Sequence, residues 1–192
     1  FHLSPEAAPK LAAPQLHIKG FQFSYEKHGP LNVDIPDLTL PQGEIIGIIG
    51  NNGAGKSTFA RCLCGLDKKA KGVLEMDGAS YDAKQRRHIS YMVMQDVNHQ
   101  LFTEDVLDEL MLSMDGEDEK ADTARAKEIL NSLDLLGKAK LHPMSLSGGE
   151  KQRVAIGSAI ASDKKVLIFD EPTSGLDYRH RAGVENIKNY TY

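Results

Sequence analysis

The glycine-rich stretch GNNGAGKST, residues 50–58, has the residue types and the spacing that phosphate binding requires. It fits the pattern G-x-x-x-x-G-K-[ST] at Gly50, Gly55, Lys56 and Ser57. Glycines let the backbone wrap closely around a polyphosphate with its N–H groups pointing inward. The Lys56 ammonium can reach the outer phosphates, and the Ser57 hydroxyl can ligate Mg²⁺. The other residues of this predicted nucleoside triphosphate site are Asn51, Asn52, Gly53, Ala54 and Thr58.

Two adjacent acids, Asp170 and Glu171, follow the apolar stretch KVLIF. In a parallel sheet this stretch would end near the phosphate loop, because ligands bind at the carboxyl ends of the strands. Asp170 could then hold the Mg²⁺, directly or through water. Glu171 could polarise the water that attacks the terminal phosphate, a contribution of about 10²–10⁴-fold in rate. The structural alternative is that Glu171 and Pro172 start a turn, where both residue types are common.

A second glycine motif, LSGGEKQR at residues 146–153, opens a stretch of helical character. Ser147 and Glu150 have the spacing of a capping box, which explains the start of a helix. A capping box does not explain the two glycines inside it, Gly148 and Gly149. Bare N–H groups at a helix start suit a phosphate. Since the loop at 50–57 already accounts for one nucleotide, this motif is predicted to serve a nucleotide bound elsewhere.

The elements that must position these residues alternate between strands and helices. Residues 44–50 (EIIGIIG) are apolar throughout, which predicts a strand buried on both faces, followed by a helix from Lys56. Residues 16–25 and 32–40 alternate apolar and polar residues, which predicts a hairpin. Further predicted strands cover 72–78, 89–95 and 165–170, and amphipathic helices cover 105–114, 121–136 and the segment after LSGG.

This order predicts an α/β fold with a mainly parallel sheet, an antiparallel N-terminal β part and an inserted helical lobe at about 96–150. We expect a linker-like segment at 1–15 and one domain over 16–192, incomplete at its C-terminus. A frayed N-terminus is the open alternative for the first segment.

Composition excludes several function classes. The net charge of −4 argues against a nucleic-acid surface, which would be basic and clustered. No apolar run reaches the roughly 18 residues of a membrane span.

Cys62 and Cys64 lie two residues apart on a predicted helix, so they should point in different directions. We expect them to be buried and reduced, with neither a metal nor a disulfide.

Taken together, the chain resembles the ABC-type ATPases, which have a P-loop NTPase core. The motifs GNNGAGKST, LSGGEKQR, VLIFDEPT and SGLD occur in the order of that family, and the resemblance covers about residues 16–178. It implies ATP and Mg²⁺ as ligands and a head-to-tail dimer that encloses two ATP molecules. Ser147, Gly148 and Gly149 would then act on the terminal phosphate held by the partner domain.

The resemblance also implies roles for three further residues. Gln95 matches the glutamine that contacts Mg²⁺ and the attacking water; read alone, it is a polar residue at a strand end. Tyr25 matches the aromatic residue that stacks on adenine, although it could simply be a strand aromatic. Asp177 matches the acid that communicates between the two nucleotide sites.

A narrower resemblance is to the ATPases of energy-coupling-factor vitamin and metal importers, carried by MQDVNHQLFTEDVLDEL at 94–110. It implies a transmembrane transporter subunit as partner and a peripheral place on the cytoplasmic face of the cell membrane. The N-terminal linker suggests the second half of a fused tandem ATPase.

The sequence departs from the family after Asp177. The family continues with a helix, a buried strand and a histidine that contacts the terminal phosphate, and too few residues follow Asp177 for these. His180 comes too early for that role. We therefore expect this chain to bind nucleotide better than it hydrolyses it. The alternatives are a non-hydrolytic nucleotide-binding remnant and a soluble non-transport ABC ATPase, for which the expected coiled-coil insertion or basic linker is missing from the sequence.

Overall fold

The computed structural model describes residues 14–170. Glu171, Asp177 and His180 lie outside the described residues, as does nearly all of the predicted linker.

The N-terminal half of the described chain forms an antiparallel sheet. Its strands are β1 (Gln15–Phe23), β2 (Val33–Pro41), β3 (Lys71–Met76) and β4 (Ala79–Tyr81), in the order β2-β1-β3-β4. The pairing of β1 with β2 confirms the predicted hairpin. The inner face carries Ile18, Phe21 and Leu74, all fully buried, because these apolar side chains pack against the first helix, α1 (Lys56–Leu63).

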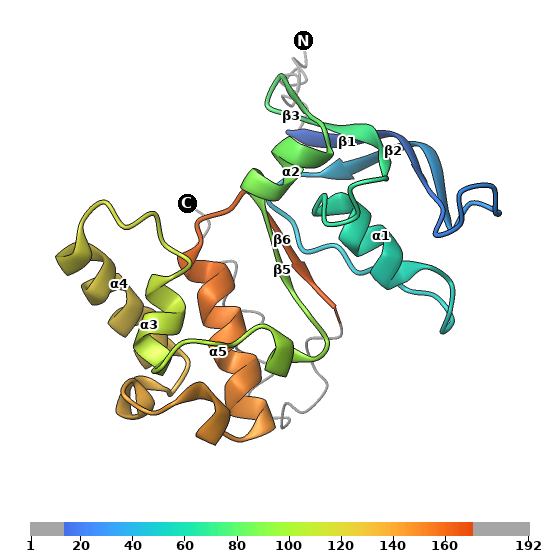
Figure 1. Cartoon of the computed structure of the whole chain (residues 1–192). Helices are drawn as coiled ribbons and strands as arrows, with labels where there is room; N and C mark the ends of the chain where they lie inside the picture. The colour runs from blue at the N-terminus through green and yellow to red at the C-terminus, as the bar shows by residue number, and fades with distance from the viewer. Residues whose placement is uncertain (1–13, 171–192) are drawn as a thin grey trace, which may run out of the picture.

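The parallel part of the fold consists of β5 (Ser90–Val93) and β6 (Val166–Phe169), paired in register from Ser90 opposite Val166 to Val93 opposite Phe169. Figure 1 shows these two strands running between the antiparallel sheet with α1 and a group of helices on the other side. Both were predicted as strands.

The helical group contains α3 (Val106–Met111), α4 (Glu119–Ser132) and α5 (Gly148–Ala161), with short 3₁₀ helices η1 (Val97–His99), η2 (Leu136–Lys138) and η3 (Pro143–Ser145). Asp105 and Asp118 cap α3 and α4 by accepting backbone N–H groups of their first turns. These helices confirm the three predicted ones, with shifted ends. Within residues 14–170, no helix has both the length and the apolar character needed to cross a bilayer.

Two hydrophobic cores hold these parts together. One joins α3, α4 and α5 with the end of β5, through residues such as Leu110, Leu130 and Val154. The other joins the antiparallel sheet with α1. Cys62 and Cys64 are buried free thiols, as predicted, and burial raises their pKa values to about 11 and about 12.

The prediction of a buried strand at 44–50 is wrong. Residues 45–50 have no strand structure, and their side chains are exposed, up to 95% for Ile49. A cleft of about 760 Å³ separates residues 43–48 from β6 and is lined by apolar side chains from both. In the described chain β6 pairs only with β5, so no described strand pairs with the apolar stretch. Apolar composition without a paired backbone does not make a strand.

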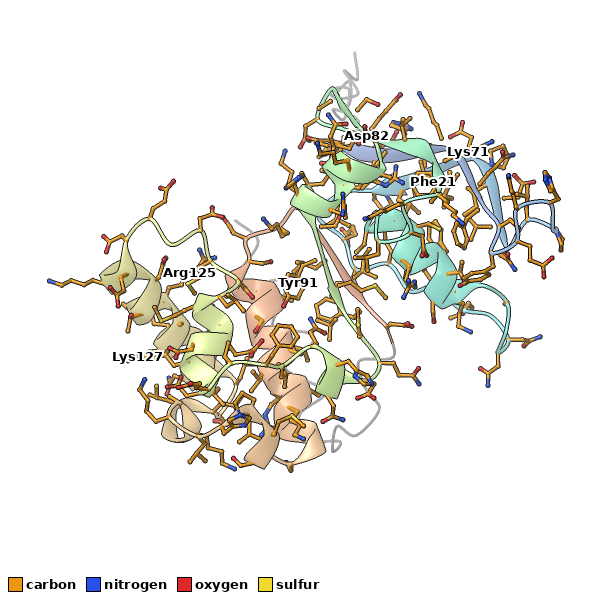
Figure 2. The ribbon with its side chains drawn as sticks, viewed as in Figure 1. Phe21, Lys71, Asp82, Tyr91, Arg125 and Lys127 are labelled. Carbon is orange, nitrogen blue, oxygen red and sulfur yellow. The ribbon has the colours of Figure 1, made fainter. Side chains whose placement is uncertain are left out.

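A short helix, α2 (Ala83–Ile89), was not predicted. Asp82 and Gln85 form a capping box at its start, a spacing that could have revealed it. Its Arg86 is fully buried, lies 4.4 Å from the centre of the Phe21 ring and donates to the carbonyl of Gly72. Figure 2 shows Asp82 at this helix and Phe21 on the neighbouring sheet. Arg86 therefore fastens α2 to the antiparallel sheet.

Candidate nucleotide-binding site

The glycine-rich loop leads directly into α1, and its shape depends on glycine. Gly53 and Gly55 have φ angles of +81° and +88°, which L side chains rarely adopt. A Cβ atom added at Gly55 would lie 3.0 Å from the backbone oxygen of Asn32. Gly55 is also the N-cap of α1, with no side-chain cap. The first N–H groups of the helix are therefore left to a ligand, and the helix dipole favours an anion there.

The Lys56 side chain folds back across the loop. Its ammonium donates to the backbone oxygens of Gly50, at 2.7 Å, and Asn51, at 3.0 Å. The loop itself is held by a turn in which the Ala54 N–H donates to Asn51. Among the described residues, the partners of this ammonium are neutral carbonyl oxygens, so the anionic oxygens of a phosphate can compete for it.

Ser57 and Asp170 meet although 113 positions separate them in the chain. The Ser57 hydroxyl donates to a carboxylate oxygen of Asp170 at 3.1 Å. The backbone explains the position of Asp170, because its N–H donates to Val93 and continues the pairing of β6 with β5. A hydroxyl and a carboxylate are hard oxygen donors, and two such groups beside a phosphate loop fit Mg²⁺.

Tyr25 lies beside the start of α1. Its hydroxyl is hydrogen-bonded to that of Thr58 at 2.9 Å, and its backbone N–H donates to the Asn32 side chain. The ring packs edge-on against Phe23, and Tyr25 as a whole is 58% exposed. Tyr25 is thus anchored at both ends while much of its ring surface stays accessible to a ligand.

Gln95 lies on the exposed loop that follows β5. Since β5 and β6 are parallel and end together, Gln95 and Asp170 emerge from the same edge of the sheet. The loop is held by Asp96, which caps η1, and by a hydrogen bond of 2.9 Å from the Lys151 ammonium to Asn98. Lys151 belongs to α5, so the loop after β5 is joined to the first turns of that helix.

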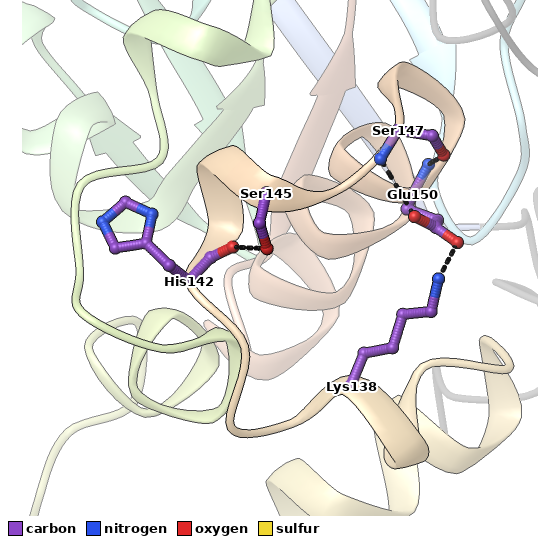
Figure 3. A network of polar contacts seen from close by, with 5 residues as sticks. All are labelled: Lys138, His142, Ser145, Ser147 and Glu150. Carbon is purple, nitrogen blue, oxygen red and sulfur yellow. Dashed lines mark hydrogen bonds and ion pairs between the residues drawn. The ribbon is translucent and has the colours of Figure 1, made fainter.

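Ser147 caps α5, as the capping-box pattern predicted. Its N–H donates to one carboxylate oxygen of Glu150 at 2.9 Å, and the Glu150 N–H points to the Ser147 hydroxyl at 3.4 Å. The other Glu150 oxygen contacts the Lys138 ammonium (Figure 3). This contact and the Ser147 N–H hold the pKa of Glu150 down to about 2. Sequence reasoning missed Lys138, because a separation of 12 residues has no local pattern.

The two glycine motifs belong to different parts of the structure. Helix α1 packs against the antiparallel sheet through Phe59, Cys62 and Leu63, whereas α5 packs with α3 and α4. Tyr25, Lys56, Ser57 and Asp170 gather at the first motif. The described residues thus bring the candidate phosphate-binding side chains together at the first motif, whereas Ser147, Gly148 and Gly149 start a helix of the other core.

The chain is similar to known proteins in sequence and in fold. The family profile described as "ABC transporter" matches residues 33–174. An ABC transporter ATP-binding protein of Treponema denticola is 51% identical over 137 residues, covering 71% of this chain and 27% of the relative. The methionine import ATP-binding protein MetN of Bacillus subtilis is 40% identical over 160 residues, covering 79% of this chain and 47% of MetN.

Among solved structures, CbiO1 of Clostridium perfringens, part of the ABC transporter complex CbiONQ, superimposes with a TM-score of 0.74. It is 26% identical in sequence, and the match covers 90% of this chain and 71% of CbiO1. The chain spans less than half the length of the two curated relatives named above. The profile match covers most of the chain and the fold agrees with it, which confirms the predicted α/β class: the chain belongs to the ABC transporter family, with the fold of its ATPases.

Proposed function

We propose that this chain binds Mg-ATP at the loop Gly50–Thr58 and serves as an ATPase module of an ABC importer. The contact between Ser57 and Asp170 carries the proposal, because it brings a hydroxyl and a carboxylate to the edge of a phosphate loop from distant parts of the chain. These two residues would hold the Mg²⁺, which neutralises phosphate charge when bound. Lys56 would leave its loop carbonyls for the outer phosphates, and Tyr25 would stack on the adenine.

Hydrolysis would use the two residues next to this metal pair. Glu171 directly follows Asp170 in the sequence and would polarise the attacking water. Gln95 emerges from the same sheet edge as Asp170 and would contact the Mg²⁺ and the water.

The partner of the module would be a second ABC ATPase domain, arranged head to tail. Ser147, Gly148 and Gly149 would act on the terminal phosphate held by that domain, and Asp177 would communicate between the two sites. The separation of α5 from α1 into different cores supports this, since the second motif is built away from the first. Fusion of the two domains in one chain remains part of the proposal.

Transport would proceed through a transmembrane subunit, with the module on the cytoplasmic face of the membrane. The relatives support import: MetN is named for methionine, and a Corynebacterium glutamicum relative, 39% identical over 160 residues and covering 73% of this chain, is named for arginine transport. The likeness to CbiO1 supports the energy-coupling-factor class. The segments 1–15 and 16–192, with a helical lobe at about 96–150, are the domain division we propose.

The phosphate loop is tested by thermal unfolding with Mg-ATP. Ligand at a hundredfold excess over its Kd stabilises the folded state by about 2.7 kcal/mol, so the melting temperature should rise. Lys56→Ala should lose that rise. Lys127→Ala, which removes an exposed lysine from α4 (Figure 2), is the control and should keep it. An equal rise in Lys56→Ala and the control would refute the site.

The role of Glu171 is tested by measuring steady-state phosphate release, together with thermal unfolding, in the wild type and in Glu171→Gln. Glu171→Gln should keep the rise in melting temperature and slow turnover by about 10²-fold or more. Equal turnover in the variant and the wild type would contradict this role. Binding without turnover in the wild type would favour the non-hydrolytic alternative.

A further inference from the structure

The first turn of α5 contains a conflict of charge. A carboxylate at Glu150 stabilises a helix start through the capping box and the helix dipole. The same carboxylate repels an anionic ligand at the N–H groups of Gly148 and Gly149, where the proposed function places a phosphate. Like charges at such close range repel each other, and the repulsion is stronger where water is excluded.

Protonation does not remove this conflict. The contact with Lys138 and the hydrogen bond from Ser147 hold the pKa of Glu150 at about 2, so the side chain is ionised at neutral pH. Its charge must therefore be balanced by pairing. Both oxygens have partners: the Ser147 N–H on one and the Lys138 ammonium on the other (Figure 3).

The backbone holds Lys138 in place for this contact. Lys138 ends η2, and its N–H donates to Leu135, whose side chain is fully buried in the core with α5. The next residue, Ala139, accepts the N–H of Leu107 from α3 at 2.9 Å. The segment that contains Lys138 is thus hydrogen-bonded to residues of the same hydrophobic core in which α5 packs.

We propose that Lys138 is a positioning residue for the second anion site, neutralising Glu150 and holding its carboxylate on the cap so that Gly148 and Gly149 can accept a phosphate. This inference rests on the proposed function. It differs from a plain surface ion pair, because it assigns Lys138 an effect on anion affinity at α5 that acts through Glu150.

The test uses inorganic phosphate as the probe and follows backbone amide shifts by NMR. Lys138→Ala should weaken phosphate binding at the amides of Gly148 and Gly149 about fivefold, which corresponds to about 1 kcal/mol. Binding at the amides of loop 50–58 should stay unchanged. Lys138→Arg should behave as the wild type. Lys138→Ala combined with Glu150→Gln should recover the affinity, because the unbalanced charge is gone.

Lys140→Ala is the matched control. It removes the same charge two residues away, where the lysine pairs with Asp105 at 2.9 Å, and should leave the Gly148 and Gly149 amides as in the wild type. An equal loss in Lys140→Ala, or no recovery in the double variant, would overturn the proposal. Wild-type shifts at loop 50–58 but none at Gly148 and Gly149 would overturn it while the phosphate-loop proposal stands. If loop 50–58 also failed to respond to phosphate and to Mg-ATP, the proposed function itself would fall.

Discussion

The starts of α1 and α5 are both glycine-containing helix N-termini, yet they are built in opposite ways. Gly55 caps α1 in a left-handed conformation and supplies no side-chain hydrogen bond. Ser147 caps α5 in an extended conformation, with Glu150 completing a reciprocal capping box. The loop before α1 is exposed, whereas most of α5 beyond its first turn is buried.

The difference shows that the backbone N–H groups at a helix start can be left for a ligand or can be satisfied by the protein's own side chains. At α1 the backbone donors have no side-chain cap, so a phosphate can satisfy them. At α5 the side chains of Ser147 and Glu150 already satisfy part of the cap, so the proposed anion would bind to a helix start that is capped without it. The first site is therefore sensitive to backbone shape, and the second to side-chain charge.

The largest expected effect is the difference in the free energy of unfolding between Gly55→Ala at the start of α1 and Gly148→Ala at the start of α5. Gly55→Ala places a Cβ atom 3.0 Å from the Asn32 oxygen at a positive φ angle, so we expect a loss of about 1–3 kcal/mol in the free energy of unfolding. It should also lose the stabilisation by Mg-ATP. At Gly148 a Cβ atom meets nothing within 4 Å, so Gly148→Ala should stabilise slightly, by up to about 1 kcal/mol.

Urea unfolding with and without Mg-ATP measures both effects. Gly137→Ala, at a position where a Cβ atom also meets nothing, serves as the control for a tolerated change. Equal stability in Gly55→Ala and Gly148→Ala would show that the contrast between the two helix starts has no energetic basis.

Removing the Ser147 side-chain cap of α5 should lower the free energy of unfolding by a smaller amount than Gly55→Ala does. Ser147→Ala removes the acceptor of the Glu150 N–H and should lower the free energy of unfolding by about 1 kcal/mol. Ser147→Thr retains the acceptor and should stay close to the wild type. Chemical denaturation provides the comparison, and an unchanged stability in Ser147→Ala would mean that the capping box contributes nothing.

The smallest expected effect is the pH dependence of the stability that the Glu150 carboxylate contributes. Its pKa is about 2 in the folded protein and about 4.5 when unperturbed, so its ionisation favours folding above pH 4.5. This contribution is lost as the pH falls toward 2. Glu150→Gln keeps the cap but cannot ionise, and should cost less than about 1 kcal/mol at neutral pH, since the pair with Lys138 is accessible to water.

Denaturation curves at several pH values check this. The difference between wild type and Glu150→Gln should shrink steadily from pH 4.5 toward pH 2. A difference that stays constant over this range would contradict the ion pair as its cause.

Sequence reasoning succeeded where a few neighbouring residues carry the information. The glycines of 50–58, the cap at Ser147 and the hairpin of β1 and β2 follow from local backbone geometry and from alternation. It failed at 44–50, where an unbroken apolar run predicted a buried strand. The run is exposed because no described strand pairs with it, and pairing is not a local property.

The sequence by itself determined the family motifs, the cap of α5 and the choice of residues able to hold phosphate and metal. Only the tertiary structure decided that Ser57 meets Asp170 and that Lys138 balances Glu150. The reason is physical. A turn or a cap depends on residues a few positions apart, whereas the partner of a strand, a metal ligand or a buried charge is chosen by how distant segments pack together.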